Sequence, residues 1–192
     1  IEIYKEVIEI DPGNEAAVES LERIVENPEF KKEVAEILEP IYREYGEWEK
    51  LVGVIEIMIA EEETVDRRVD LLHEIANLYE TAGDEPEKAF ATLGRALKED
   101  PEQERTQEEL ERMARVLTLY EELAAMYSEQ VGAIENEELA ASFHLKIASI
   151  CEEQLQDLDR AITHYKEVLG IDSMHLEAAS ALERAYQINE NY

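Results

Sequence analysis

The most restrictive feature of this sequence is that it repeats itself after 72 residues. That shift superposes Leu38 on Leu110, Ile75 on Ile147, Ala89 on Ala161 and Asp100 on Asp172. A fixed period predicts an array of stacked units instead of one closed globule, because each unit buries its apolar face against its neighbours. Arrays of this kind present a long surface to another macromolecule. The period therefore favours a binding scaffold over a catalyst.

The start of the sequence repeats at a different distance. Residues 1–23 match residues 162–184 at eleven positions, an offset of 161 residues, which is two periods of 72 plus 17. Seventeen residues are half of a 34-residue helix pair, so we expect about one extra helix between Arg23 and Leu38 and a change of stacking register there. We divide the single array 1–192 into an irregular unit 1–37, full units 38–109 and 110–181, and the start of a further unit 182–192. We also expect this array to be a segment of a longer chain.

The chain carries a large excess of negative charge. It has 48 acidic and 18 basic residues, which give a formal net charge of -30. Nucleic acid phosphates and anionic lipid headgroups bind where lysine and arginine are in local excess, so this field repels both. We expect neither a nucleic acid nor a membrane surface among the partners.

The cysteine content fits a reducing compartment. Cys151 is the single cysteine, so no internal disulfide can form. No apolar run approaches the length of a membrane span, and no signal peptide is visible. We therefore expect a cytoplasmic protein.

The hydrophobic pattern is helical along nearly the whole sequence. Apolar residues recur at spacings of three and four, and Gly- and Pro-containing turns such as residues 11–14 and 83–86 separate the helical stretches. The sequence thus predicts an all-α solenoid of antiparallel helix hairpins without a β-sheet. Pro40 lies inside the helical pattern of residues 29–45, which predicts either a kinked helix or two short helices. Thr118 stands where the preceding unit has Gly46, which raises the alternative that this turn is lost.

One segment resembles a known family. The tetratricopeptide repeat (TPR) is a helix pair with the pattern W-x2-L-G-x2-Y, then A-x3-F-x2-A-x4-P. The corresponding positions here are Leu72, Ile75, Ala76 and Tyr79, then Ala89, Leu93, Ala96 and Pro101. A second, looser copy has His144, Cys151, Tyr165, Val168 and Ser173 at the equivalent positions, and residues 38–55 suggest a more divergent pair. The chain is thus similar to a tandem TPR array over most of its length.

The resemblance implies a right-handed superhelix whose first helices line a concave groove for peptides or partner helices. The candidate groove-lining residues are His73, Asn77, Arg105, Arg112, Arg115 and Ser149. The three arginines are spaced by seven and three residues and so share one helical face. They predict a cationic strip that binds peptide carboxylates through paired hydrogen bonds. In the alternative, which we favour, each arginine pairs with a neighbouring glutamate.

Side-chain patterns typical of catalysis are missing from this sequence. The histidines, including His144 and His164, share no metal-ligand spacing, and Cys151 has no second cysteine nearby. The sequence has no Gly-rich phosphate loop, serine nucleophile elbow or zinc-protease motif. We expect no enzyme activity, no cofactor and no metal in this segment.

Three functions remain compatible with the sequence. The first is a scaffold that binds a peptide or a partner helix in a concave groove. The second is a structural spacer or assembly segment of a large repeat protein, and the third is an acidic chaperone for a basic client. Salt distinguishes the third, because binding of a basic client weakens steeply as ionic strength rises.

Overall fold

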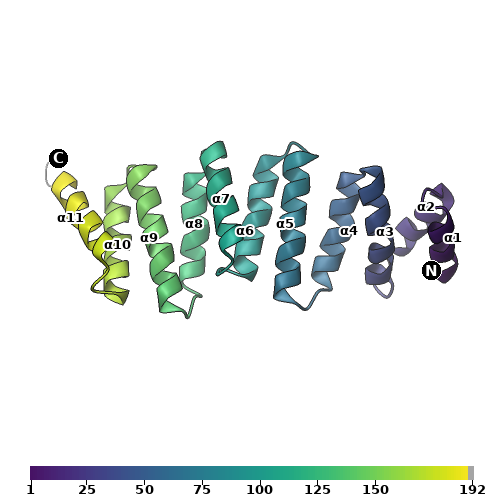
Figure 1. The fold of residues 1–192 in the computed structure, drawn as a ribbon, viewed down its shortest axis with the longest axis horizontal. Coiled ribbons are helices and arrows are strands. Elements are labelled where there is room, and N and C mark those ends of the chain that lie inside the picture. The colour runs from purple at the N-terminus through teal and green to yellow at the C-terminus, as the bar shows by residue number, and fades with distance from the viewer. Residues whose placement is uncertain (190–192) are drawn as a thin grey trace. The chain divides into compact units, whose positions relative to one another are not determined.

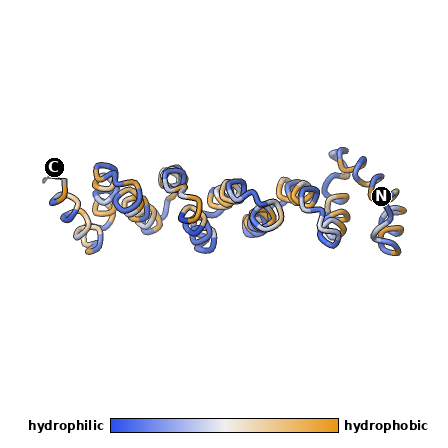
Figure 2. Tube along the Cα trace, turned by 90° about the horizontal axis from the view of Figure 1, so that it is seen from above, coloured by the Kyte–Doolittle hydropathy of each residue, from blue (hydrophilic) through white to orange (hydrophobic). Residues whose placement is uncertain are grey.

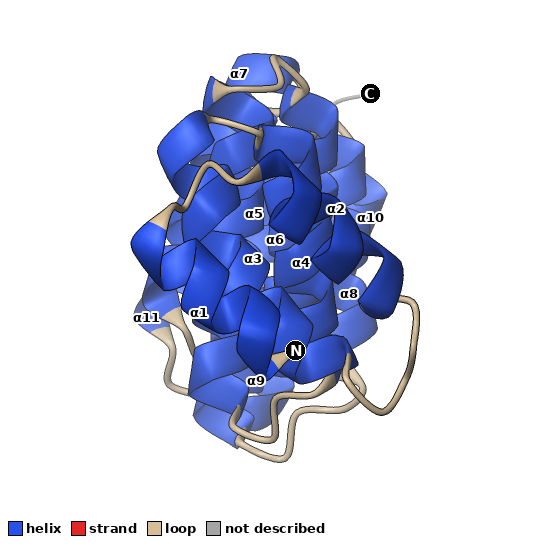
Figure 3. Cartoon of the chain, turned by 90° about the vertical axis from the view of Figure 1, so that its right-hand side faces the viewer, coloured by secondary structure: helices blue, strands red, loops and turns tan. Residues whose placement is uncertain are grey.

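A computed structural model of the chain describes residues 1–189, which form eleven α-helices and no strand (Figure 1, Figure 3). This confirms the predicted all-α fold. The chain divides into two compact units, Ile1–Asp100 and Pro101–Tyr192, called here the N-terminal and the C-terminal unit. The last three residues of the predicted repeat unit 182–192 lie outside the described residues.

Helix hairpins build both units. The N-terminal unit contains α1 (Glu2–Ile10), α2 (Glu15–Ile24), α3 (Lys31–Tyr45), α4 (Trp48–Ala60), α5 (Val65–Thr81) and α6 (Pro86–Glu99). The C-terminal unit contains α7 (Glu104–Leu117), α8 (Tyr120–Val131), α9 (Glu137–Glu153), α10 (Leu158–Ile171) and α11 (Leu176–Asn189). Within each unit every helix packs against the next helix in sequence. None of the described helices is both long and apolar enough to cross a membrane.

The helices are amphipathic, and side chains cap several of them. Figure 2 shows hydrophobic and hydrophilic residues together along the helices. The side chain of Asn14 accepts a hydrogen bond from the backbone N–H of Ala17 (3.1 Å), and that of Asp157 accepts one from the backbone N–H of Arg160 (3.1 Å). Such caps satisfy N–H groups that have no partner inside the helix, typically stabilising it by about 1 kcal/mol.

The turns repeat with the sequence period, even where the residue types differ. Glu47 N–H donates to the Tyr42 carbonyl (2.9 Å), and at the equivalent place Leu119 N–H donates to the Ala114 carbonyl (3.0 Å). Thr118 keeps the left-handed conformation of Gly46, so the turn between α7 and α8 is present and the alternative that it is lost is wrong. Backbone hydrogen bonding and the packing of the flanking helices therefore outweigh the steric cost of a β-branched residue there.

Pro40 neither ends α3 nor divides it, since the helix runs without interruption from Lys31 to Tyr45. A proline inside a helix removes the hydrogen bond to the carbonyl four residues earlier, here that of Glu36. Both Pro40 and Glu36 are exposed, so water can hydrate the freed carbonyl. The alternative of two short helices is therefore wrong, because residues 31–45 form one helix.

At the irregular start of the array, two successive helices, α2 and α3, correspond to the same helix of the repeat unit. In the sequence alignment α2 matches the start of α11, and α3 matches α7, which itself lies one period before α11. A six-residue turn, Val25–Phe30, joins α2 to α3, so no separate helix lies between Arg23 and Leu38. The extra half-period therefore arises because the same helix of the repeat unit occurs twice in succession. The division into repeat units stays a prediction.

Small residues let the paired helices approach closely. Ala89 in α6 and Ala161 in α10 are fully buried, as is Ala148 in α9. Larger side chains such as Leu72 and Phe143 fill the space around them. This alternation of small and large residues gives close packing between helices and explains why alanine recurs with the period.

Candidate functional site

An open groove with a volume of about 350 Å³ lies in the C-terminal unit. It runs along α7 and α9, with the first turn of α8 and the start of α11 at its edges. Its lining combines Tyr120, Leu123, Leu145 and Ile150 with charged and amide side chains. Both α7 and α9 are first helices of their hairpins, which the resemblance to the TPR implies as the helices of a ligand groove.

Arg115 and Ser149, which the sequence selects as groove residues, both line this groove. Arg115 is exposed, and its side chain makes no hydrogen bond or ion pair among residues 1–189. Ser149 is half-buried on α9. An unpaired guanidinium beside apolar side chains suits a carboxylate that arrives with an apolar neighbour, because the guanidinium offers two parallel donors.

The second cation of the groove is already neutralised. Lys146 forms an ion pair with Glu111, and the hydroxyl of Tyr127 donates a hydrogen bond to the same carboxylate (3.1 Å). Tyr127 is fully buried, and burial together with the negative charge of Glu111 raises the pKa of its hydroxyl well above the usual range. The cluster Glu111–Tyr127–Lys146 therefore forms a fixed part of the groove, while Arg115 stays available.

The other predicted groove residues are not brought to this place. Arg105 and Arg112 are exposed on α7 but do not line the groove, and Arg112 is engaged with Glu109 (2.8 Å). His73 and Asn77 belong to the N-terminal unit, in α5. Asn77 is exposed, whereas His73 is only 6% exposed, which leaves little of its ring for a ligand.

The sequence contains three Leu-Glu-Arg triplets, which end at Arg23, Arg112 and Arg184, and each of these arginines has a glutamate partner. Arg23 contacts Glu19 (3.5 Å), Arg112 contacts Glu109 (2.8 Å), and Arg184 donates to both oxygens of Glu152 (2.9 and 3.0 Å). For these arginines the local-pairing alternative holds. Arg115 lies outside the triplets and differs from them in having no such partner among the described residues.

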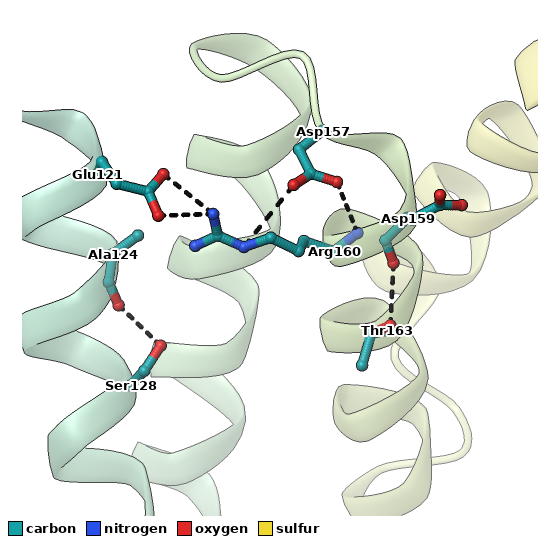
Figure 4. Close-up of polar contacts among 7 residues, drawn as sticks. All are labelled: Glu121, Ala124, Ser128, Asp157, Asp159, Arg160 and Thr163. Atoms are coloured by element: carbon teal, nitrogen blue, oxygen red, sulfur yellow. Dashed lines mark hydrogen bonds and ion pairs between the residues drawn. The ribbon is translucent and has the colours of Figure 1, made fainter.

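A network on the second helices fixes neighbouring hairpins to each other (Figure 4). Arg160 in α10 donates to both carboxylate oxygens of Glu121 in α8 (2.7 and 2.9 Å). It also lies 3.9 Å from the carboxylate of Asp157, which caps its own helix. Both hydrogen bonds to Glu121 come from one nitrogen, Nη1 of Arg160, so the contact connects α10 to α8 without the parallel fork of a bidentate arginine–carboxylate pair.

Two histidines for which the sequence predicts no common site, His144 and His164, are in contact in the structure. The Nδ1 atoms of His144 in α9 and His164 in α10 lie 2.9 Å apart, so one ring donates and the other accepts. Burial lowers the pKa of both rings, and the His144 ring lowers that of His164 further. In the sequence, this contact is indicated only by the position of both histidines in one predicted hairpin. The preceding unit has no such pair, because Leu72 and Thr92 stand at the equivalent positions. Among residues 1–189, no group of three or more His, Cys, Asp or Glu side chains could hold a metal ion.

The comparisons with known proteins agree with the helix hairpins. Residues 141–173 match the model of the tetratricopeptide repeat family, and no curated protein matches the chain. The match falls on the looser copy of the motif and not on the segment from Leu72 to Pro101. Together with the helix pairs, it makes the chain a TPR-like helical repeat protein.

Two solved structures are similar to the chain. The TPR domain of P58(IPK) is 17% identical with a TM-score of 0.45, over 98% of this chain and 55% of that one. A thermophilic TPR protein of Thermus thermophilus is 15% identical with a TM-score of 0.40, over 90% of both chains. This chain thus spans about 55% of the first of these structures.

Proposed function

We propose that this chain is a protein-interaction scaffold that binds a peptide, or a helix of a partner protein, in the groove along α7 and α9. TPR-like repeat proteins are in general scaffolds without catalytic activity. The observation that carries the proposal is that Arg115, unpaired among residues 1–189, lines the same groove as the apolar side chains of Leu123, Leu145 and Ile150. A cytoplasmic location belongs to the proposal and is supported by the single cysteine, Cys151, which is buried and unpaired.

The groove chemistry defines the ligand. Its apolar side chains contact one or two apolar side chains of the ligand. Arg115 donates hydrogen bonds to a carboxylate next to them. Glu153 and Glu177 also line the groove, and the chain as a whole carries a charge of -30, so a long acidic segment would be repelled. The proposed ligand is therefore a mostly apolar peptide with one carboxylate, either a side chain or a C-terminus.

A peptide-display selection on the chain, followed by titration of the selected peptides, tests the proposal. Arg115→Ala is expected to weaken binding by about 2 kcal/mol or more, because a desolvated charge pair loses one partner. Arg67→Ala is the matched control, since Arg67 is likewise exposed and has no ion pair among the described residues. It lies in the N-terminal unit, so its loss is expected to cost under about 1 kcal/mol.

Two results would contradict the proposal. Equal affinities of the wild type and Arg115→Ala, with the helical signal intact, would make Arg115 a surface charge without a ligand. Failure to select any peptide that binds saturably would instead support the spacer or assembly function.

A further inference from the structure

The N-terminal unit contains a second groove with different chemistry. Its volume is about 490 Å³, and it is bounded by the α1–α2 turn, by α2 and α3, and by the first turn of α4. It therefore lies at the irregular start of the array, where the same helix of the repeat unit occurs twice in succession. Two tyrosine rings, Tyr42 and Tyr45, line it together with four glutamates.

One lysine that lines the groove, Lys50, contacts both a carboxylate and an aromatic ring. The ammonium of Lys50 lies 3.0 Å from a carboxylate oxygen of Glu22 and 5.5 Å from the centroid of the Tyr42 ring. The Tyr42 hydroxyl donates to the same carboxylate (2.8 Å). Burial disfavours the charged form of Glu22, but the hydrogen bonds from Lys50 and Tyr42 outweigh it and lower the pKa of this carboxyl. Half of the groove thus holds a cation between a carboxylate and an aromatic face.

The same pairing of lysine with tyrosine recurs elsewhere in the chain. Lys88 lies over Tyr79 (5.5 Å), Lys146 over Tyr127 (5.8 Å) and Lys166 over Tyr186 (5.4 Å). A cation over an aromatic face is attracted by the electron density of the ring. Several tyrosine rings of this chain thus have a lysine ammonium over the ring face.

Tyr45 offers an equivalent place that the chain leaves open. Its side chain is 55% exposed, and among residues 1–189 no cation lies over its ring. Its hydroxyl stands against the α1–α2 turn because residue 13 is glycine, where a Cβ atom would lie 2.7 Å from that oxygen. The glycine therefore leaves room for the Tyr45 side chain to lie beside this turn, where its ring lines the groove.

Unpaired carboxylates accompany this ring. Glu15 and Glu47 line the groove, and their carboxylates make no hydrogen bond or ion pair with any described residue. The carboxylate of Glu19 pairs only with the highly exposed Arg23, at 3.5 Å. An aromatic face with carboxylates is also the environment of Lys50 in the same groove, where Glu22 and Glu47 both favour its charged form.

We propose that this groove binds a lysine or arginine side chain of an extended basic segment in a partner protein, with the cation over Tyr45 and close to Glu15 and Glu47. The site is separate from the Arg115 groove and prefers the opposite charge. It goes beyond the proposed function, because it gives the scaffold a second binding surface in the other unit.

The probe for this site is an acetylated, amidated peptide of alternating glycine and lysine, titrated against the chain at about 0.15 M salt. Saturable binding that shifts the NMR signals of the Tyr45 ring is expected. Tyr45→Leu removes the aromatic face and should weaken binding about fivefold, whereas Tyr45→Phe keeps the face and should change it less than about twofold. The same peptide with acetylated lysines should not bind.

Diffuse attraction to an acidic protein is the main competing explanation, and a pair of double variants separates it. Glu15→Gln with Glu47→Gln removes two groove charges, and Glu6→Gln with Glu9→Gln removes two exposed charges on α1 in the same unit. The first is expected to weaken binding about fivefold, because short-range contact is lost, and the second less than about twofold.

Three results would overturn the proposal. They are equal weakening by the two double variants, unchanged affinity of Tyr45→Leu, and no saturable shift of the Tyr45 signals at about 1 mM peptide. Arg115→Ala should leave this binding unchanged, so failure at either groove can be recognised separately.

Discussion

Thr118 carries a conformational cost that the equivalent Gly46 avoids. Both residues end a helix in the left-handed region, with φ of 59° for Thr118 and 70° for Gly46. A non-glycine residue in this region destabilises the folded state by about 1 to 2 kcal/mol. Glycine avoids this strain but loses more conformational entropy on folding, which offsets roughly half of the gain. We predict that Thr118→Gly raises the free energy of unfolding by about 1 kcal/mol, measured by urea denaturation followed by circular dichroism.

Gly46→Ala is the control for this prediction, with the opposite sign. No atom lies within 4 Å of a Cβ placed on Gly46, so only its backbone conformation opposes the substitution. The variant should lose about 1 kcal/mol. If Thr118→Gly were less stable than the wild type, the side chain of Thr118 would contribute more than its backbone costs.

The pair of His144 and His164 makes stability depend on pH. Because the folded pKa of each ring is lowered, the unfolded chain binds protons more readily, and the stability from the neutral pair is present above the unfolded pKa of about 6.5. It is lost as the pH falls from there through the folded pKa values. Glu167 favours protonation of both rings and so moderates the effect, whereas Arg160 opposes protonation of His164 and so strengthens it.

The double variant His144→Leu with His164→Thr isolates this contribution, since it installs the residues of the preceding unit. Between pH 7.5 and 5.5, values on either side of about 6.5, the wild type is expected to lose more stability than the variant. Thermal denaturation at both pH values checks the prediction. Equal losses would show that protonation of the two rings does not oppose folding.

At the scale of helices, clusters of tyrosine, glutamate and a cation connect neighbouring elements. Tyr127 in α8 donates to Glu111 in α7, which also pairs with Lys146 in α9. The Tyr165 hydroxyl in α10 makes the same kind of contact with Glu152 in α9 (2.7 Å). A hydrogen bond from a buried hydroxyl to a charged acceptor contributes more than an exposed ion pair, because the hydroxyl has lost its contact with water.

Removing the hydroxyl of Tyr127 measures one such connection. Tyr127→Phe should lower the free energy of unfolding by about 1 to 2 kcal/mol, because the hydrogen bond to a charged acceptor is lost while the contact with Phe143 remains. Tyr4→Phe is the control, since the Tyr4 hydroxyl makes no hydrogen bond within residues 1–189, and it should change stability by less than about 0.5 kcal/mol. Chemical denaturation of both variants decides between a structural connection and an incidental contact.

The elements themselves could be predicted because the period and the turn residues define them locally. The continuity of α3 through Pro40 could not, since it depends on whether the carbonyl of Glu36 faces water. The turn at Thr118 could not either, because packing of the flanking helices overrides the local preference of threonine. In both cases the conformation of the backbone depends on tertiary contacts, because the local propensity of the residues does not determine it.

The candidate site was predictable only in part, for a similar reason. Helical spacing places Arg105, Arg112 and Arg115 on one face, but which of them is unpaired depends on side-chain contacts such as that of Arg112 with Glu109. The burial of His73 follows from packing of α5 against both α4 and α6, which covers more of the helix than one apolar stripe. Spacing identifies a face, and only the packed neighbours show which residues on it remain available.

Across the molecule, several of the 18 basic residues form ion pairs that join one helix to another. Arg43 with Glu74, Lys146 with Glu111, and Arg184 with Glu152 join first helices, while Arg95 with Glu56 and Arg160 with Glu121 join second helices. Exposed pairs of this kind contribute under about 1 kcal/mol each, so packing supplies most of the stability. In a chain of net charge -30, an unpaired arginine in a groove is therefore the feature most directly available for binding.

Mapping a bound peptide on the whole chain tests the central claim most directly. A peptide from the display selection, carrying a spin label at one end, is added to isotope-labelled protein, and the broadening of backbone NMR signals is recorded. We predict broadening concentrated on residues 111–120 and 145–154, and much weaker broadening in Arg115→Ala at the same peptide concentration. Broadening centred elsewhere, or unchanged in Arg115→Ala, would contradict the claim that this groove is the binding surface of the scaffold.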